Sequence, residues 1–235
     1  MGQHRGMQRA LMLFDLDGTL LDHDGAELAA ITGWIRDAGF PTVVGEVPSD
    51  ELWRQIAEAA YADYVAGRTS FAEQRRLRAR KFLTLMGCDP SSAYDDDMDA
   101  AFEEYARRYA DALRPFDDVA GSLARLARDF RVAVLTNGDQ AQQEGKVRRA
   151  GLDSLVEATI ASSSLGCAKP DAAAFHGALA RLGAAPEGTT YIGDRLDVDA
   201  RAAASAGLAG VWLNRRGSVA DAGPLRTITT LSALP

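Results

Sequence analysis

Short apolar runs alternate with longer amphipathic stretches over most of this chain, and the alternation predicts its secondary structure. Five apolar runs have the length of buried strands, at residues 10–14, 132–135, 157–161, 189–192 and 210–213. Helical stretches at 142–150, 172–182 and 199–206 are each followed or closed by a glycine, as helices often are. Strands that alternate with helices of this length predict right-handed crossovers and a parallel sheet, which the run at 10–14 is expected to join.

Residues 22–115 interrupt this alternation with helices only. Helices are predicted near 24–38, 49–66, 70–86 and 94–112, with Gly39 and Gly87 as stops and Ser49 and Ser70 as N-caps. The segment is too long for a single crossover, so we predict an inserted helical bundle with hinges near residues 21–24 and 113–117. The alternative is a packed helical layer beside the sheet that does not move independently.

Composition and charge narrow the class of protein. The 235 residues, 47% hydrophobic and 25% charged, have the composition of a soluble globular protein. The formal net charge of -7 argues against nucleic acid or an anionic membrane as partner, and no apolar run reaches the roughly 18 residues of a membrane span. Cys88 and Cys167 lie far apart in sequence and are expected to be reduced thiols. We expect a cytoplasmic monomer or homodimer.

The first strand is followed by two carboxylates, Asp15 and Asp17, in a turn with Gly18 and Thr19. Carboxylates crowded at a strand end repel one another, so they need a cation between them or a raised proton affinity. Ligand sites in open parallel sheets lie at the carboxyl ends of strands. The pattern therefore indicates metal-assisted chemistry; the alternative is an acidic turn whose side chains cap backbone N–H groups.

Three further clusters follow later strands. Residues 136–138, Thr-Asn-Gly, offer a hydroxyl and backbone N–H groups that suit phosphate oxygens. Lys169 stands just before a predicted helix N-terminus, where a fixed cation suits an anion. Asp194 and Asp199 form a second acidic cluster. Each cluster alone has an ordinary explanation: a locally capped turn, a solvated lysine or an acidic helix start.

Taken together, the clusters are chemically consistent. Asp15, Asp17 and Asp194 carry three negative charges, so a divalent cation is needed before a phosphate dianion can approach. Oxygen ligands without Cys or His nearby favour Mg²⁺ over Zn²⁺. Lys169 offsets part of the remaining charge.

In this order, the motifs resemble those of the haloacid dehalogenase superfamily of hydrolases. The resemblance is carried by Asp15-x-Asp17-Gly18-Thr19, Thr136-Asn137-Gly138, Lys169-Pro170-Asp171, and Gly193-Asp194 with Asp199 five residues later. It implies a three-layer α/β/α Rossmann-like core formed by residues 1–21 and 116–235, with a helical cap at 22–115.

The resemblance also implies roles for these residues. Asp15 would be the nucleophile and Asp17 the general acid/base. The phosphoryl group would be held by Thr136 and Lys169, with Gly18 and Asn137 in the same phosphate-binding set. Mg²⁺ would be bound by Asp15, the Asp17 carbonyl and Asp194, supported by Thr19 and Asp199.

We therefore expect a Mg²⁺-dependent phosphatase that forms an aspartyl-phosphate. An alkoxide leaves only with a proton whereas a halide needs none, so the acid at Asp17 argues for phosphate esters rather than dehalogenation. Gln143, Lys146 and Gly151 resemble the branch of nucleotidases and sugar-phosphate phosphatases, so the expected substrate is a nucleotide, a sugar phosphate or a phosphoglycolate-like molecule.

Two alternatives remain open: a phosphoglucomutase-like phosphoryl transferase, and a phospho-acceptor signalling domain. The roles of two residues are also open. His23 is either a substrate contact or an exposed hinge residue, and Arg195 either faces the cap or forms a surface salt bridge.

Overall fold

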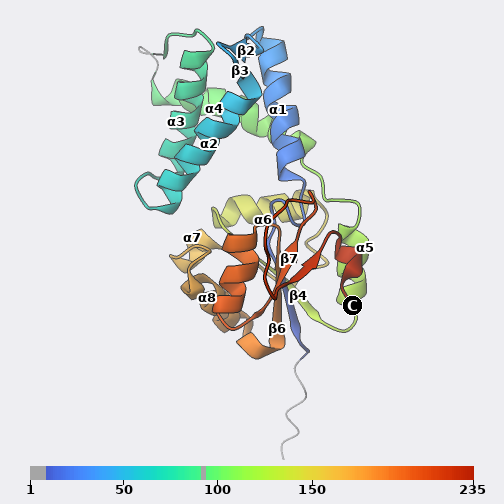
Figure 1. Ribbon diagram of the computed structural model, residues 1–235. Helices are drawn as coiled ribbons and strands as arrows, with labels where there is room; N and C mark the ends of the chain where they lie inside the picture. The colour runs from blue at the N-terminus through green and yellow to red at the C-terminus, as the bar shows by residue number, and fades with distance from the viewer. Residues whose placement is uncertain (1–8, 91–93) are drawn as a thin grey trace, which may run out of the picture. The chain divides into compact units, whose positions relative to one another are not determined.

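The chain folds into two compact units in a computed structural model that describes residues 9–90 and 94–235. The first, here called the sheet unit, comprises the chain up to Asp22 together with Arg114–Pro235. The second, the helical unit, is His23–Leu113. Both are shown in Figure 1. None of the helices in the described part of the chain has the length and apolar character of a membrane span.

The sheet unit is built on a six-stranded sheet in the order β5-β4-β1-β6-β7-β8. Its strands are β1 (Leu11–Phe14), β4 (Arg131–Thr136), β5 (Thr159–Ala161), β6 (Thr189–Gly193), β7 (Ala209–Leu213) and β8 (Arg226–Ile228). All five pairings are parallel, which confirms the predicted α/β class. The strand β8 was not predicted, because only its last residue is buried and it therefore carries no apolar run.

Helices flank this sheet on both sides, and α5 and α8 lie on opposite sides of the strands in Figure 1. The helices of the unit are α5 (Val119–Leu126), α6 (Gln140–Arg149), α7 (Ser162–Leu165), α8 (Ala172–Leu182) and α9 (Ala202–Ser205), with short turns η2 (Pro186–Gly188) and η4 (Leu231–Ala233). The helix predicted at 199–206 begins earlier, as a π-helical segment, η3 (Leu196–Arg201).

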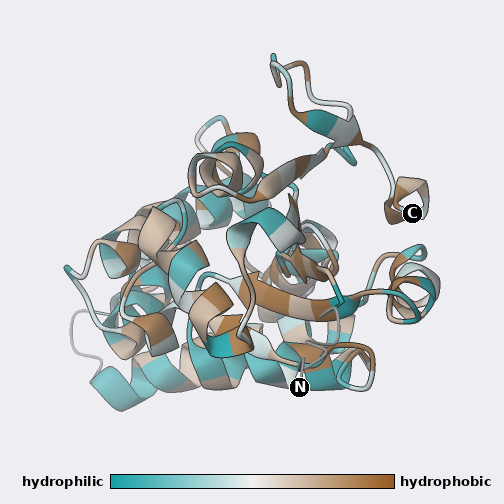
Figure 2. Cartoon of the chain, turned by 90° about the horizontal axis from the view of Figure 1, so that it is seen from below, coloured by the Kyte–Doolittle hydropathy of each residue, from teal (hydrophilic) through white to brown (hydrophobic). Residues whose placement is uncertain are grey.

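Alternate side chains of the central strands form the core beneath the site. Leu11, Leu13, Leu135 and Tyr191 belong to one buried cluster that also includes Phe175 of α8. Successive strand residues point to opposite faces, so this set marks the face of the sheet that α8 covers. In Figure 2 the strands in the middle of the sheet are largely brown, or apolar, whereas the surrounding helices carry both brown and teal turns.

The helical unit contains the four predicted helices: α1 (His23–Ala38), α2 (Ser49–Val65), α3 (Phe71–Leu85) and α4 (Asp95–Ala112). Its core is aromatic: Trp34, Trp53, Phe82, Phe102 and Tyr105 are all buried. Large rings bury much area per residue and prefer edge-to-face contacts, such as the 5.9 Å Trp34–Trp53 pair.

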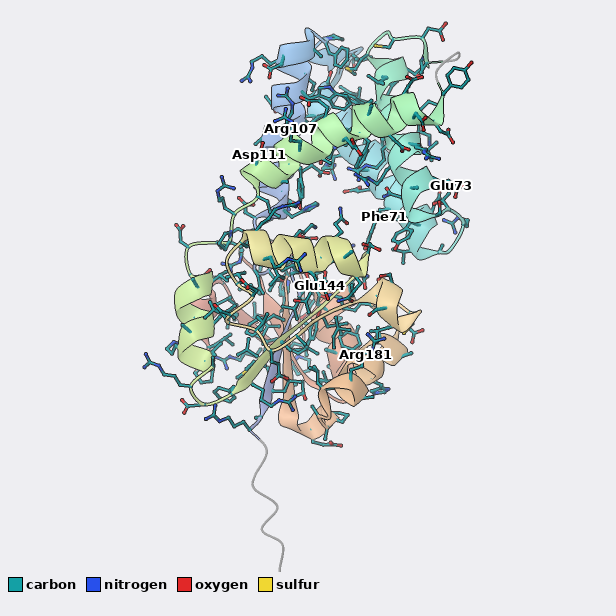
Figure 3. The ribbon with its side chains drawn as sticks, turned by 180° about the vertical axis from the view of Figure 1, so that it is seen from behind. Phe71, Glu73, Arg107, Asp111, Glu144 and Arg181 are labelled. Atoms are coloured by element: carbon teal, nitrogen blue, oxygen red, sulfur yellow. The ribbon has the colours of Figure 1, made fainter. Side chains whose placement is uncertain are left out.

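One predicted helix cap is confirmed and one is wrong. Ser70 caps α3 in a capping box with Glu73, which is labelled in Figure 3. Ser49 is instead the first residue of α2, and its hydroxyl donates to the Pro41 carbonyl at 2.6 Å. The cause is a small hairpin, β2 (Val43–Val44) with β3 (Val47–Pro48), which brings Ser49 back beside residue 41.

The two connecting segments leave the sheet unit side by side. Leu21 forms an antiparallel bridge with Pro115, and the Asp22 N–H donates to the Arg114 carbonyl at 2.9 Å. The insertion therefore begins and ends at one place in the sheet unit.

Candidate active site

The predicted clusters lie at the carboxyl end of three neighbouring strands. Phe14, the last residue of β1, pairs with Val134 of β4 and Ile192 of β6. Because parallel strands end at the same edge, Asp15, Thr136 and Asp194 follow these positions along one edge of the sheet. The loop between α7 and α8 brings the fourth cluster, Lys169, into contact with Asp15.

Three carboxylates converge at this edge. Asp15, Asp194 and Asp199 each offer an oxygen, and these atoms lie within 4.8 Å of one another. Asp15 is 7% exposed and Asp199 is 1% exposed, so water screens their repulsion poorly. Such a group requires a proton, a positively charged side chain or a metal ion.

The pKa values of Asp15 and Asp194 reflect this crowding. Burial raises the pKa of Asp15 to about 8; Lys169 opposes the rise, and Asp199 and Asp194 add to it. Burial, followed by the charge of Asp199, raises the pKa of Asp194 to about 6. A bound divalent cation would favour the ionised carboxylates, and a set of hard oxygen donors suits Mg²⁺.

Lys169 supplies a buried positive charge between two of these acids. Its Nζ lies 2.6 Å from Asp15 Oδ1, Asp199 Oδ1 and the Tyr191 hydroxyl, which together match the three protons of an ammonium group. Burial alone would lower the pKa of Lys169, but Asp15 and Asp199 outweigh it and hold that pKa above its usual range. Lys169 therefore stays charged.

Tyr191 is a site residue that the sequence reasoning missed. Its hydroxyl accepts from Lys169 and lies 3.0 Å from the Leu135 carbonyl, to which it donates. The available signal was weak: Tyr191 is a side chain with a polar tip inside an otherwise apolar strand.

Asn137 holds the Lys169 backbone rather than presenting its side chain to a ligand. Its Nδ2 donates to the Lys169 carbonyl at 2.8 Å, and its Oδ1 accepts from the Lys169 N–H at 2.9 Å. Gln143 Nε2 in turn donates to the Asn137 carbonyl at 2.9 Å. A role of Asn137 in phosphate binding therefore rests on its backbone N–H. Thr136 is buried at the end of β4, 2% exposed.

Asp17 is not a member of the carboxylate group formed by Asp15, Asp194 and Asp199. Its Oδ2 lies 2.5 Å from Nζ of Lys146, a buried lysine on α6. The metal-ligand role that the family resemblance gives to Asp17 concerns its backbone carbonyl, so this side-chain contact leaves that prediction open. The same contact fixes the direction of the carboxylate predicted to act as acid and base.

Gly18 and Thr19 shape the position of Asp194. Gly18 has φ +83°, and a Cβ at this position would lie 2.5 Å from Asp194 Oδ2. The Asp194 N–H donates to the Thr19 hydroxyl at 3.0 Å, and that hydroxyl lies 3.4 Å from Asp194 Oδ1. Trp212 Nε1 donates to the Asp194 carbonyl at 2.8 Å. The position of Asp194 thus depends on Gly18, Thr19 and Trp212.

The π-helical segment η3 turns Asp199 back toward the strands. Arg195 donates its N–H to Asp199 Oδ2 at 3.0 Å. A Cβ on Gly193 would lie 2.4 Å from the Asp199 carboxyl carbon, so only glycine permits this approach.

The Arg195 side chain itself is exposed. His23, the other residue of open role, is half-buried in the helical unit, with Nδ1 2.7 Å from the Tyr109 hydroxyl.

Comparison with known proteins gives consistent findings. A family model described as haloacid dehalogenase-like hydrolase matches residues 10–207. Glyceraldehyde 3-phosphate phosphatase of Methanopyrus kandleri is 30% identical, over 91% of this chain and 87% of that protein. N-acylneuraminate-9-phosphatase of Mus musculus is 33% identical, over 88% of this chain and 84% of that protein.

Among solved structures, the HAD-hydrolase YfnB of Bacillus subtilis superposes with a TM-score of 0.77. The match covers 96% of each chain at 23% sequence identity. At that identity the likeness is one of fold.

Proposed function

Because this chain belongs to the haloacid dehalogenase-like hydrolase family, we propose that it is a Mg²⁺-dependent hydrolase of phosphoric monoesters. Its substrate is a small phosphorylated metabolite. The observation that carries the proposal is the convergence of Asp15, Asp194 and Asp199 around Lys169 at one edge of the sheet.

In the proposed reaction, Asp15 acts as the nucleophile. Its carboxylate oxygen attacks phosphorus and the bond from phosphorus to the leaving oxygen breaks, which gives an aspartyl-phosphate. Asp17 donates its proton to the leaving oxygen. It then takes a proton from the water that attacks the aspartyl-phosphate, so inorganic phosphate leaves and both residues return to their starting state. General acid/base help of this kind contributes roughly 10²–10⁴-fold in rate.

Asp15, Asp194 and the Asp17 carbonyl would hold the metal ion, with Asp199 and Thr19 in support. The fit rests on the donor set, because Asp15, Asp194 and Asp199 offer converging carboxylate oxygens and no sulfur or imidazole ligand is among them. When bound, Mg²⁺ supplies positive charge that offsets the repulsion between these carboxylates and a phosphate dianion. The YfnB structure, which shares the fold, is bound to magnesium.

Lys169 would bind the phosphoryl oxygens, together with Thr136 and the backbone N–H groups near Gly18 and Asn137. The three protons of Lys169 are already taken up by Asp15, Asp199 and Tyr191. A phosphoryl oxygen must therefore replace one of these acceptors. Asp15 is the natural one to be replaced, since its carboxylate turns toward phosphorus in the reaction.

The helical unit would act as a cap over the reaction. Its insertion directly after the first motif fits a role in excluding water and selecting the leaving group.

The relatives named above act on phosphorylated sugars or sugar acids, to judge from their names. We propose sugar phosphates, nucleotides and phosphoglycolate-like molecules as the substrates to test. Cys88 and Cys167 are free thiols, and a cytoplasmic location stays a prediction from the sequence.

The test is Asp15→Asn at saturating Mg²⁺, with Asp153→Asn, at an exposed position, as the matched control. Phosphate release is measured from p-nitrophenyl phosphate and from the three substrate classes. Asp15→Asn is expected to lose turnover and Asp153→Asn to keep it. Turnover retained by Asp15→Asn would refute the nucleophile assignment. Formation of a new phosphosugar instead of free phosphate would indicate a transferase, and one-to-one protein phosphorylation without turnover would indicate a phospho-acceptor domain.

A further inference from the structure

Arg215, in the turn after β7, connects two segments that are far from it in sequence. Its Nη1 and Nη2 donate to Asp118 Oδ2 and Oδ1 at 3.0 and 2.9 Å. Nη2 and Nε also donate to the Thr19 carbonyl at 2.9 and 3.3 Å. The side chains of Arg215 and Asp118 are each 15% exposed, so this is a largely desolvated, bidentate ion pair.

Thr19 connects Arg215 to Asp194, a residue of the proposed cation site. The carbonyl of Thr19 is bound by Arg215, and the hydroxyl of the same residue binds the N–H of Asp194. Thr19 is fully buried, so its hydroxyl cannot turn to water if its backbone shifts. The geometry of Asp194 therefore depends on where Arg215 holds the Thr19 backbone.

We propose that Arg215 is a positioning residue for the cation site, acting on Asp194 through Thr19. The inference rests on the proposed function, because it assumes that Asp194 is a metal ligand. A planar guanidinium can bind the Asp118 carboxylate and the Thr19 carbonyl at the same time. A lysine at this position carries the same charge but lacks the planar set of N–H donors that binds both groups.

Arg215 also holds together the two segments that lead into and out of the helical unit. Its guanidinium carbon lies 4.1 Å from the centre of the Phe116 ring. The Phe116 N–H donates to the Leu20 carbonyl at 3.1 Å. One side chain thus contacts the segment after β1, at Thr19, and the returning segment, at Phe116 and Asp118.

A purely structural role would be to anchor the C-terminal segment. Asp118 accepts from the Thr230 hydroxyl at 2.6 Å and from the Leu231 N–H at 2.7 Å, so loss of Arg215 would disturb this anchor too. Arg125 supplies the control, because it donates to the carbonyls of Leu234 and Leu231, at 3.1 and 3.5 Å. It ties down the same segment without contacting Thr19.

The experiment measures binding of Mg²⁺ alone by isothermal titration calorimetry on the full chain. The proteins are wild type, Arg215→Lys, Arg215→Met and the matched Arg125→Met; methionine keeps an apolar stem over Phe116 without any donor. A second readout is the change in tryptophan fluorescence on adding Mg²⁺. It is assigned to Trp212, whose ring N–H binds the Asp194 carbonyl, by its loss in Trp212→Phe at a Mg²⁺ concentration at which calorimetry shows this variant to be saturated.

We expect the Kd for Mg²⁺ to rise about tenfold in both Arg215 variants, in line with the loss of outer partners of metal ligands. The Trp212 signal should then require correspondingly more Mg²⁺, and Arg125→Met should match wild type in both measurements. An unchanged Kd in folded Arg215→Lys and Arg215→Met would overturn the proposal, as would an equal rise in Arg125→Met. If wild type neither binds Mg²⁺ nor releases phosphate, the proposed function itself fails, and this inference fails with it.

Discussion

Replacement of Gly18 by alanine should separate the stability of this protein from its activity. Gly18 has φ +83°, and a left-handed conformation costs an alanine about 1–2 kcal/mol. The new Cβ would also lie 2.5 Å from Asp194 Oδ2, so the carboxylate must move by about 0.9 Å to reach the 3.4 Å of an ordinary contact. A carboxylate at the end of a side chain can move at little cost in stability. As the proposed metal ligand, Asp194 would then lie well outside the roughly 0.2 Å tolerance of a metal site.

Gly151 provides the matched control in the same unit. It has φ +68°, and a Cβ built there meets nothing within 4 Å. Gly151→Ala therefore suffers the backbone strain without displacing a ligand. Both variants should lose about 1–2 kcal/mol of stability, which lowers Tm by roughly 2–4 °C per kcal/mol for a chain of this size.

The assays are thermal unfolding, Mg²⁺ titration and kcat/KM with p-nitrophenyl phosphate. Gly18→Ala is expected to lose roughly 10²-fold in kcat/KM, the effect of a misplacement near 1 Å, while Gly151→Ala keeps wild-type activity. If the two variants have the same kcat/KM and the same affinity for Mg²⁺, the argument that Gly18 makes room for Asp194 is wrong.

Three further predictions follow from single contacts. Tyr191→Phe leaves the Leu135 carbonyl and one Lys169 proton without their partner, so unfolding in urea should show a loss of about 1–3 kcal/mol, with a reduced kcat/KM. Burial pushes the pKa of Asp118 up, but hydrogen bonds from Arg215, Thr230 and the Leu231 N–H hold it below its usual value. The carboxylate of Asp118 therefore stabilises the fold above about pH 4, and this contribution disappears as the pH falls through the folded-state pKa. The gap in urea midpoint between wild type and Asp118→Asn should accordingly shrink from pH 7 to about pH 3; a constant gap would contradict it. Ser70→Ala removes one half of the capping box of α3 and should cost the helical unit about 1 kcal/mol, whereas Ser49→Ala tests a hydroxyl that caps nothing.

The strands could be predicted where burial leaves a mark on the local sequence. All four residues of β1 are buried, and a run of apolar residues reports this directly. In β8 only the last of three residues is buried, and each strand of the β2–β3 hairpin has only two residues. These strands are therefore too short for a hydrophobic pattern to be detected in the sequence. The error at Ser49 has the same origin, because the hairpin that removes it from the cap position was not visible.

The site could be predicted as far as topology determines it. Parallel strands end at one edge, so residues just after β1, β4 and β6 had to lie near one another whatever their exact contacts. The partner of each side chain could not be foreseen in the same way. Asp17 and Lys146 are separated by 129 positions, and Arg215 and Thr19 by 196. Such pairs depend on the packing of whole helices and loops, and no local spacing encodes them.

The bridge between Leu21 and Pro115 makes the helical unit an exchangeable module. Because its two attachment points are neighbours, a segment of almost any length can be spliced in there without stretching the sheet or altering strand order. A genetic exchange at this one junction would leave the acidic edge intact while replacing the unit that we propose selects the leaving group. New selectivity can therefore be acquired in a single recombination, with the chemistry already in place.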